Sequence, residues 1–144
     1  MKRDEFIKAF GIGVAAACTG CLAACKKSGS DSDGGPQPPT PPANINFSID
    51  LNSEIKNIGE SKVSNGVIVV RTGPTNDVSS FTAVQVACTH EGTSINYNAN
   101  QARFICPNHG SQFATTGAVL LGPAATSLKV YNISIQGSTL TVKS

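Results

Sequence analysis

The sequence predicts an all-β protein whose short antiparallel strands form a sandwich. Apolar and polar residues alternate with a period of two through most of residues 45–142, which is the pattern of half-buried strands. Turn-forming residues separate the alternating runs, and no segment after residue 25 shows the spacing of an amphipathic helix. About 100 residues of such strands are sufficient for one sandwich or barrel with functional loops at one end.

The expected strands follow one another along the chain as residues 45–51, 67–71, 81–87, 103–105, 118–121, 128–135 and 139–142. The first run is the clearest, because Ile45, Phe47 and Ile49 share one face while polar residues share the other. Asn65-Gly66 is a turn signal before the second run, and residues 136–138 connect the last two runs as a hairpin.

The length and composition fit one small domain with non-globular ends. The chain has 144 residues, with 14 glycines, 8 prolines and only 14% charged residues. The net charge of +2 is too small for nucleic acid to be an expected partner. Most of the five cysteines crowd the first 25 residues and the others stand alone in the body, so no disulfide framework can be read from them.

Residues 1–24 have the layout of an export signal. A basic start at Lys2, Arg3 and Lys8 is followed by an apolar stretch of small residues at 9–24. This stretch is shorter than the ~20 residues of a membrane-spanning helix, so we expect a cleaved signal peptide rather than a permanent span. The start also resembles a twin-arginine signal in part, with Lys-Arg in place of Arg-Arg, and the export route stays open.

Leu22-Ala23-Ala24-Cys25 resembles the lipobox of bacterial lipoproteins, in which an aliphatic residue and two small ones precede a cysteine that becomes lipidated and N-terminal. The resemblance implies that Cys25 carries acyl chains that hold the protein on a membrane surface. It also implies an exported lipoprotein on the periplasmic or outer side of a bacterial membrane. The alternative is that Cys25 is only a small apolar residue at the end of a signal.

Residues 25–43 are expected to form a lipid-anchored linker that precedes the folded domain, residues 44–144. Ser, Gly, Asp and Pro dominate the linker, and such a composition cannot bury a core. Its Gly/Ser half should be flexible and its proline half extended, which would hold the domain some tens of ångströms from the anchor at ~3 Å per residue. An inert linker is equally compatible with this composition.

Two short loops contain every thiol and imidazole of the predicted domain. The first is Cys88-Thr89-His90-Glu91-Gly92 and the second is Cys106-Pro107-Asn108-His109-Gly110-Ser111. Thiolates and imidazoles together are ligands for iron–sulfur clusters and for zinc. Each loop mixes the two ligand types, whereas zinc sites usually group cysteine with cysteine and histidine with histidine. A single structural zinc held by the same four ligands stays open as the alternative.

The spacing Cys-x-His followed by Cys-x-x-His-Gly-Ser resembles the two cluster-binding loops of Rieske [2Fe-2S] proteins. The similarity continues through Phe113 and Thr116-Gly117, and Gly122-Pro123-Ala124 resembles the proline loop that covers the cluster in that family. It spans about residues 67–142. The resemblance implies a Rieske-type antiparallel sandwich with a cluster-binding subdomain made of two loops and a proline loop.

The resemblance also implies the cofactor and its ligands. One [2Fe-2S] cluster would be held by Cys88 and Cys106 on one iron and by His90 and His109 on the other. Ser111 would donate a hydrogen bond to a bridging sulfide.

Two features of the high-potential members of the family are missing from this sequence. Phe113 stands where those members have a tyrosine whose hydroxyl supports a cysteine sulfur. Thr93 and Asn108 stand where they have the cysteines of a disulfide that braces the two loops. We therefore expect a reduction potential below that of the Rieske proteins of respiratory complexes.

The function expected from these patterns is one-electron transfer by a membrane-tethered iron–sulfur protein. Such a protein would serve a larger oxidoreductase or electron-transport chain through redox protein partners, and no substrate site of its own is expected. Glu91 beside His90 is interpreted as a solvated loop carboxylate rather than a catalytic acid or base. The alternative is a structural or interaction lipoprotein that binds zinc with the same Cys2His2 ligands.

Overall fold

The computed structural model describes residues 39–144, so the expected signal peptide, Cys25 and most of the linker lie outside the described residues. The described strands form three antiparallel sheets. The described residues also include one short 3-10 helix, η1 (Val78–Ser80). The predicted all-β antiparallel fold is confirmed. Between residues 39 and 144, none of the helical structure has the length and apolar content needed to cross a membrane.

Each sheet is built from strands that are near one another in the sequence, except that the two ends of the domain pair together. The first sheet has the order β1 (Asn46–Asp50), β10 (Thr139–Lys143) and β9 (Asn132–Gln136). The second has the order β2 (Ser61–Ser64), β3 (Val67–Arg71) and β4 (Phe81–Gln85). The third has the order β5 (Asn96–Asn98), β6 (Arg103–Ile105), β7 (Gln112–Ala114) and β8 (Val119–Leu121).

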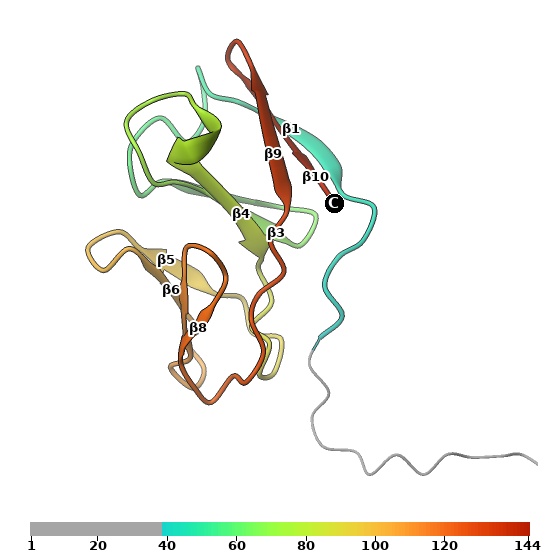
Figure 1. Cartoon of the computed structure of the whole chain (residues 1–144), viewed down its shortest axis with the longest axis vertical. Coiled ribbons are helices and arrows are strands. Elements are labelled where there is room, and N and C mark those ends of the chain that lie inside the picture. Colours follow the sequence, from blue (N-terminus) through green and yellow to red (C-terminus); the bar gives the residue numbers. More distant parts are fainter. Residues whose placement is uncertain (1–38) are drawn as a thin grey trace, which may run out of the picture. The chain divides into compact units, whose positions relative to one another are not determined.

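Strand β3 is buried along its whole length because its two faces belong to different hydrophobic cores. Val67 and Val69 pack in a core with residues of the first sheet, while Ile68 and Val70 pack in a second core that includes residues of the third sheet. Successive side chains of a strand point to opposite faces, which produces this division. The second sheet therefore lies between the other two (Figure 1).

The second core connects this central sheet to the loops that carry the cysteines. Phe104 of β6 and Phe113 of β7 face each other across the strand pair and are fully buried. Cys88 and Cys106 belong to the same core, with exposed fractions of 0% and 2%. Two large aromatic side chains thus form an apolar floor beneath the part of the molecule where the predicted ligands gather.

The strands that the sequence did not predict are short and mostly polar. β2, β5 and β7 are three or four residues long, and each contains at most one large apolar residue, so the alternation gives little signal. The run expected at 128–135 also differs, because only β9 forms a strand there. Leu128 is buried in the second core and Tyr131 in the first, and the segment between them bridges to β4 through Val130 and Val84.

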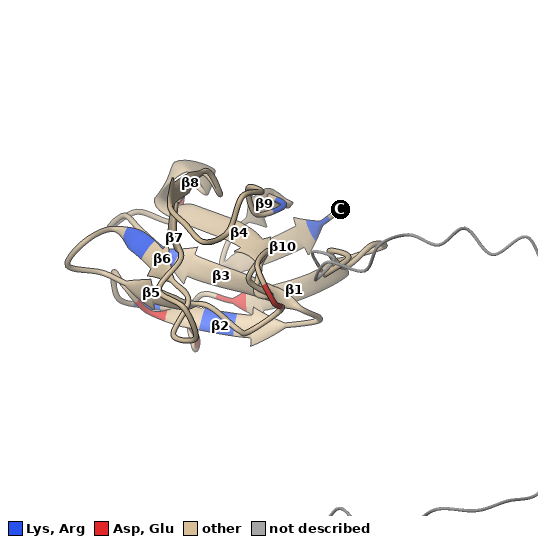
Figure 2. Ribbon diagram, turned by 90° about the horizontal axis from the view of Figure 1, so that it is seen from below, with Lys and Arg blue, Asp and Glu red and all other residues tan. Residues whose placement is uncertain are grey.

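Charged residues in the described domain are few and scattered over several strands and loops (Figure 2). Lys62 of β2 forms an ion pair with Glu54, and both side chains remain about one-third exposed. Such an exposed pair contributes at most about 1 kcal/mol to stability. This ion pair therefore adds little to the stability of the domain compared with burial of its two hydrophobic cores.

Candidate functional site

The two loops that contain the predicted ligands close in the same way. In the first loop, which follows β4, the Cys88 amide donates to the carbonyl of Thr93 (2.8 Å) and the Gly92 amide donates to the carbonyl of Cys88 (2.8 Å). In the second, between β6 and β7, Cys106 donates to Ser111 (2.8 Å) and Gly110 donates to Cys106 (3.0 Å).

Each of these turns depends on a glycine in the left-handed region. Gly92 has φ +79° and Gly110 has φ +76°, values that other residues adopt only with strain. A Cβ added at Gly110 would meet no atom of the described chain within 4 Å, so the required φ, rather than crowding within the protein, explains the glycine there.

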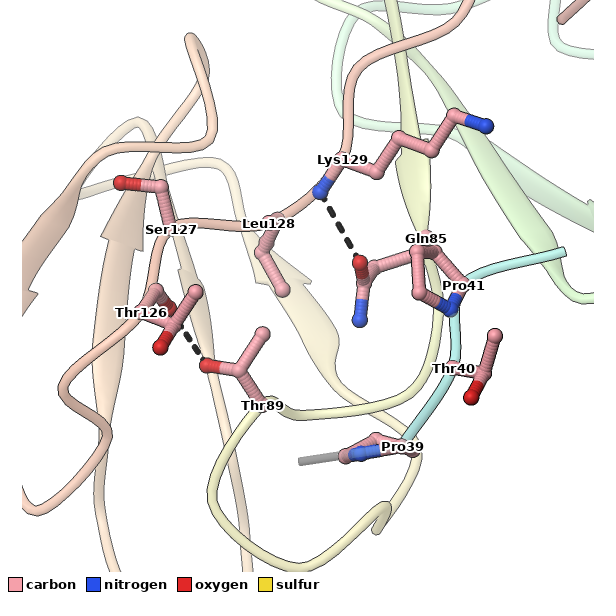
Figure 3. Close-up of a pocket in the computed structure, with 9 residues that line it drawn as sticks. All are labelled: Pro39, Thr40, Pro41, Gln85, Thr89, Thr126, Ser127, Leu128 and Lys129. Carbon is pink, nitrogen blue, oxygen red and sulfur yellow. Dashed lines mark hydrogen bonds between the residues drawn. The ribbon is translucent and has the colours of Figure 1, made fainter. Parts of the chain in front are cut away.

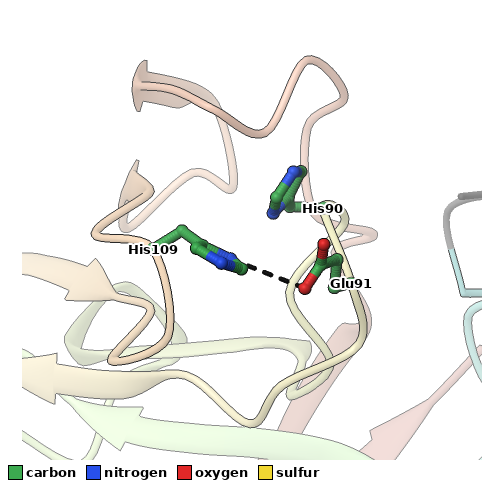
Figure 4. A group of neighbouring side chains, drawn as sticks. All are labelled: His90, Glu91 and His109. Atoms are coloured by element: carbon green, nitrogen blue, oxygen red, sulfur yellow. Dashed lines mark ion pairs between the residues drawn. The ribbon is translucent and has the colours of Figure 1, made fainter. Parts of the chain in front are cut away.

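The cysteines face the interior and the histidines face outward. Cys88 and Cys106 are buried, whereas His90 is half-buried and the side chain of His109 is 45% exposed. The two imidazole rings are neighbours, with centroids 4.9 Å apart and planes at 87° (Figure 4). The structure therefore places the thiols together on the apolar floor and the imidazoles together at the surface.

The environment of Cys88 favours the neutral thiol when no metal is bound. Burial raises the pKa of the Cys88 thiol, and the nearby Cys106 thiol raises it further. A backbone hydrogen bond at His90 and the Ser111 hydroxyl lower the pKa of Cys88, but they do not outweigh burial. A metal ion that replaces the proton would supply the positive charge that this buried position lacks.

A third segment, the proline loop of residues 122–127, is attached to both ligand loops. The buried hydroxyl of Ser111 accepts a hydrogen bond from the Ala124 amide at 3.0 Å, which ties this segment to the second loop. The Thr89 hydroxyl, between Cys88 and His90, donates to the Thr126 carbonyl at 2.5 Å and ties it to the first loop. Sequence reasoning singled out Ser111 but missed Thr89, whose neighbours in sequence give no indication of this bond.

Replacing Ser111 with alanine is expected to destabilise the protein by about 1–3 kcal/mol, because the buried Ala124 amide loses its acceptor. Chemical denaturation of the metal-loaded protein measures this change in the free energy of unfolding. Ser127→Ala is the matched control, since Ser127 is exposed and should change stability by less than about 0.5 kcal/mol. Equal stability of the two variants would show that the Ser111 hydroxyl does not hold the proline loop.

Glu91 and Asn108 form a direct connection between the tips of the two ligand loops. The Asn108 side-chain amide donates to Glu91 Oε2 at 3.1 Å, and the same oxygen lies 3.5 Å from His109 Nδ1 (Figure 4). Sequence reasoning interpreted Glu91 only as a solvated carboxylate, and its side chain is indeed 42% exposed. The contact could not be found from the sequence, because it depends on how the two loops approach each other.

The donor set fits a group with two metal ions better than a single ion. In the part of the chain that the structure describes, His90, Glu91 and His109 are the set whose ligand atoms all lie within 4.8 Å of one another, and that set includes neither cysteine. The thiol pair and the imidazole pair are therefore separate binding positions on the same two loops. Thiolates on one iron and imidazoles on the other match this separation, as in a Rieske-type cluster.

An antiparallel β domain with two neighbouring Cys/His loops and a proline loop attached to both defines a candidate iron–sulfur-binding domain. The model of the Rieske [2Fe-2S] domain family matches residues 49–132 of this chain. The chain therefore belongs to the Rieske [2Fe-2S] domain family, whose members bind one [2Fe-2S] cluster.

Two curated relatives share this domain. The cytochrome b6-f complex iron-sulfur subunit of Chlorobaculum thiosulfatiphilum is 33% identical over 88 residues, which are 58% of this chain and 46% of that protein. The subunit of the same name from Synechococcus sp. (strain CC9605) is 39% identical over 59 residues, 41% of this chain and 33% of that protein. The chain thus matches less than half the length of these relatives.

Solved structures give the same assignment. The cyanobacterial plasma membrane Rieske protein PetC3 from Synechocystis PCC 6803 is 35% identical, with a TM-score of 0.53, and the match covers 66% of this chain and 92% of that one. The ferredoxin of carbazole 1,9a-dioxygenase from Nocardioides aromaticivorans IC177 has a TM-score of 0.53 at 20% identity, with coverage of 72% and 98%. At that identity the second likeness shows the fold alone.

Proposed function

We propose that this protein is a membrane-tethered Rieske iron–sulfur protein that carries out one-electron transfer for a larger oxidoreductase or electron-transport chain. The observation that carries the proposal is the arrangement of ligands, with two buried thiols and two outward imidazoles on a pair of loops that close alike. The family assignment and the likeness to cytochrome b6-f iron-sulfur subunits support it.

In this proposal Cys88 and Cys106 bind one iron, and His90 and His109 bind the other. When bound, the cluster supplies reversible one-electron chemistry at a higher potential than an all-cysteine cluster, because neutral imidazoles replace two anionic thiolates. The residues of the chain control the access of water and of redox partners to the cluster. Phe104 and the core around it exclude water from the cysteine side, while the exposed edge of His109 gives a redox partner the shortest approach.

The expected potential is intermediate for the family. Phe113 is fully buried in the same core as the cysteines and has no hydroxyl to donate to a cysteine sulfur. An exposed hydrogen bond between Asn108 and Glu91 connects the loops in place of a disulfide. We therefore expect the missing hydroxyl and the missing disulfide to lower the reduction potential below that of respiratory-complex Rieske proteins.

Metal analysis and a redox titration of the purified protein test the proposal. We expect iron and acid-labile sulfide in equal amounts, an EPR signal on reduction, and a potential inside the family range of about −150 to +300 mV but below its upper end. A colourless protein with stoichiometric zinc would instead support a structural or interaction role. That zinc would be held by the same four ligands, Cys88, His90, Cys106 and His109, because tetrahedral zinc accepts two thiolates and two imidazoles.

We also propose that residues 1–24 are an export signal and that lipid on Cys25 anchors the protein to a bacterial membrane, with residues 25–43 as the linker to the domain. The Leu-Ala-Ala-Cys sequence supports this assignment. The partners would then be redox proteins reached from the periplasmic or outer side of that membrane. PetC3, described as a plasma membrane Rieske protein, is consistent with such a location.

Replacing Cys25 with alanine is expected to move the protein from the membrane fraction to the soluble fraction, because the acyl chains would have no attachment point. Fractionation of cells that express the full chain, followed by immunoblotting, measures the distribution. Cys21→Ala is the matched control and should stay with the membrane, since Cys21 lacks the preceding Leu-Ala-Ala. Retention of the Cys25 variant on the membrane would indicate that the N-terminal segment spans it instead.

A further inference from the structure

Residues 39–42 lie against the domain instead of leading straight away from β1. We call this segment the strap. Pro39, Pro41 and Pro42 are half-buried, and the carbonyl of Pro42 accepts hydrogen bonds from the Tyr131 hydroxyl (2.8 Å) and the Lys129 ammonium group (3.4 Å). Because Lys129 and Tyr131 both donate to the same carbonyl, they fix the position of Pro42 on the surface of the domain.

The Tyr131 donor is rigid and available at ordinary pH. Its side chain is only 4% exposed, and burial raises the pKa of the Tyr131 hydroxyl, so the hydroxyl keeps its proton. Lys129 is itself fixed, because its amide and its carbonyl both hydrogen-bond to Gln85 of β4 at 2.9 Å. The Tyr131 donor therefore belongs to the folded core, and the backbone that carries the Lys129 side chain is held to β4.

The absence of a side chain at Gly66 leaves room for Pro42 of the strap. Gly66, in the turn between β2 and β3, has φ +77°, and a Cβ built there would lie 2.6 Å from Cγ of Pro42. Any larger residue at this position would push the strap away. The close approach and the hydrogen bonds thus act on the same residue, Pro42.

The start of the strap reaches the first ligand loop. A Cβ on Gly92 would contact Pro39 at 3.8 Å, which is an ordinary van der Waals distance. Pro39, Thr40 and Pro41 form one wall of a pocket of about 450 Å³, and Thr89 with residues 126–129 forms the opposite wall (Figure 3). The strap therefore borders both the ligand loop and the proline loop.

The chain between the strap and β1 has the features of a hinge. Ala43 and Asn44 are exposed, and Asn44 adopts a left-handed φ of +57°. The next residue, Ile45, is buried and its backbone is hydrogen-bonded to Ser144. Rotation at residues 43–44 would release the strap without disturbing the pairing of β1 with β10.

We propose that residues 39–42 are a docked strap that fixes the point at which the N-terminal tether leaves the domain, beside the first ligand loop. The proposal rests on the proposed function only in taking the preceding residues as that tether. With the strap docked, the end of the domain that bears the ligand loops is the end joined to the tether. Release adds about 20 Å of reach and frees the orientation of the domain.

Distance measurement between pairs of nitroxide labels tests this proposal. The full chain is used in the oxidised form, with Cys18, Cys21 and Cys25 replaced by alanine so that lipid plays no part. Labels on Thr40→Cys and Ala125→Cys span the strap and the proline loop, and a second pair joins Thr40→Cys to Ser53→Cys, an exposed position in the turn after β1. We expect narrow distributions for both pairs and a shorter distance to position 125.

Two variants remove the contacts that hold the strap. Tyr131→Phe keeps the ring but loses the donor, and should increase the released fraction about fivefold, the equivalent of ~1 kcal/mol for one hydrogen bond. Gly66→Ala should displace the strap and broaden both distributions. Gly137→Ala is the matched control, because Gly137 also has a positive φ (+59°) in a hairpin turn but has open space around it.

The results separate this proposal from the proposed function. Broad distributions in the parent chain, or narrow ones in both Tyr131→Phe and Gly66→Ala, would overturn the docked strap whether or not the cluster is present. The iron and sulfide content of the same samples tests the cluster independently. Broadening in these two variants, with Gly137→Ala unchanged, would establish that Pro42 is held at its observed position.

Discussion

Replacing Cys106 with alanine is expected to abolish binding of the cluster. The loss of one thiolate leaves an iron without a complete ligand set, and the buried position offers no replacement, because Cys106 is 2% exposed and packed among apolar residues. Iron and sulfide content should fall to background, and the visible absorption and EPR signal should disappear. Quantitative metal analysis and spectroscopy of the purified variant measure these changes.

Asn108→Ala is the control for this experiment. Asn108 lies in the same loop, but it is exposed, and its side chain hydrogen-bonds to that of Glu91. Its loss should leave the iron content close to that of the parent protein. If Cys106→Ala retained full iron and sulfide, the assignment of this thiol as a ligand would be wrong, and the family resemblance would not extend to the metal site.

Replacing Phe104 with alanine is expected to destabilise the protein by about 3–5 kcal/mol. Phe104 is fully buried, faces Phe113 across β6 and β7, and packs edge-on against Tyr97 with ring centroids 5.3 Å apart. The cavity would open in the hydrophobic core that also contains both cysteines. Since small domains have only about 5–15 kcal/mol of total stability, denaturant titration should show a large shift in the midpoint.

Phe104→Leu keeps most of the apolar volume and serves as the matched comparison. It should lose clearly less stability than Phe104→Ala, because a smaller cavity remains. A loss of less than about 1 kcal/mol in the alanine variant would mean that the ligand loops are supported by something other than this aromatic floor.

The sequence predicted the strands that alternate clearly and the loops that contain the ligands. β1, β3 and β10 carry regular apolar patterns because one or both of their faces are buried. β5 and β7 are too short and polar to give such a pattern, and they exist because β6 lies between them and pairs with both. Their formation depends on long-range pairing, which local periodicity does not report.

The predicted cluster-binding residues are all in the two loops, whereas the predicted lipidation site, Cys25, lies outside the described residues. The sequence could not show how the two loops are supported. The bonds from Thr89 to Thr126 and from Ala124 to Ser111 join segments that are far apart in the chain. The ligand roles of Cys88, His90, Cys106 and His109 stay predictions until metal analysis tests them. The proline-rich segment that the sequence predicted to be a linker also contacts the domain, because the Tyr131 hydroxyl donates to the carbonyl of Pro42. The composition of the segment gave no reason to expect this contact.

The double-sided burial of β3 has a consequence for where substitutions destabilise the domain. Substitutions at residues 67–70 are expected to disturb one hydrophobic core or the other. Outward side chains at the loop tips, such as Glu91 and Asn108, have no comparable packing role. Substitutions at the loop tips are therefore expected to cost less stability than substitutions in β3.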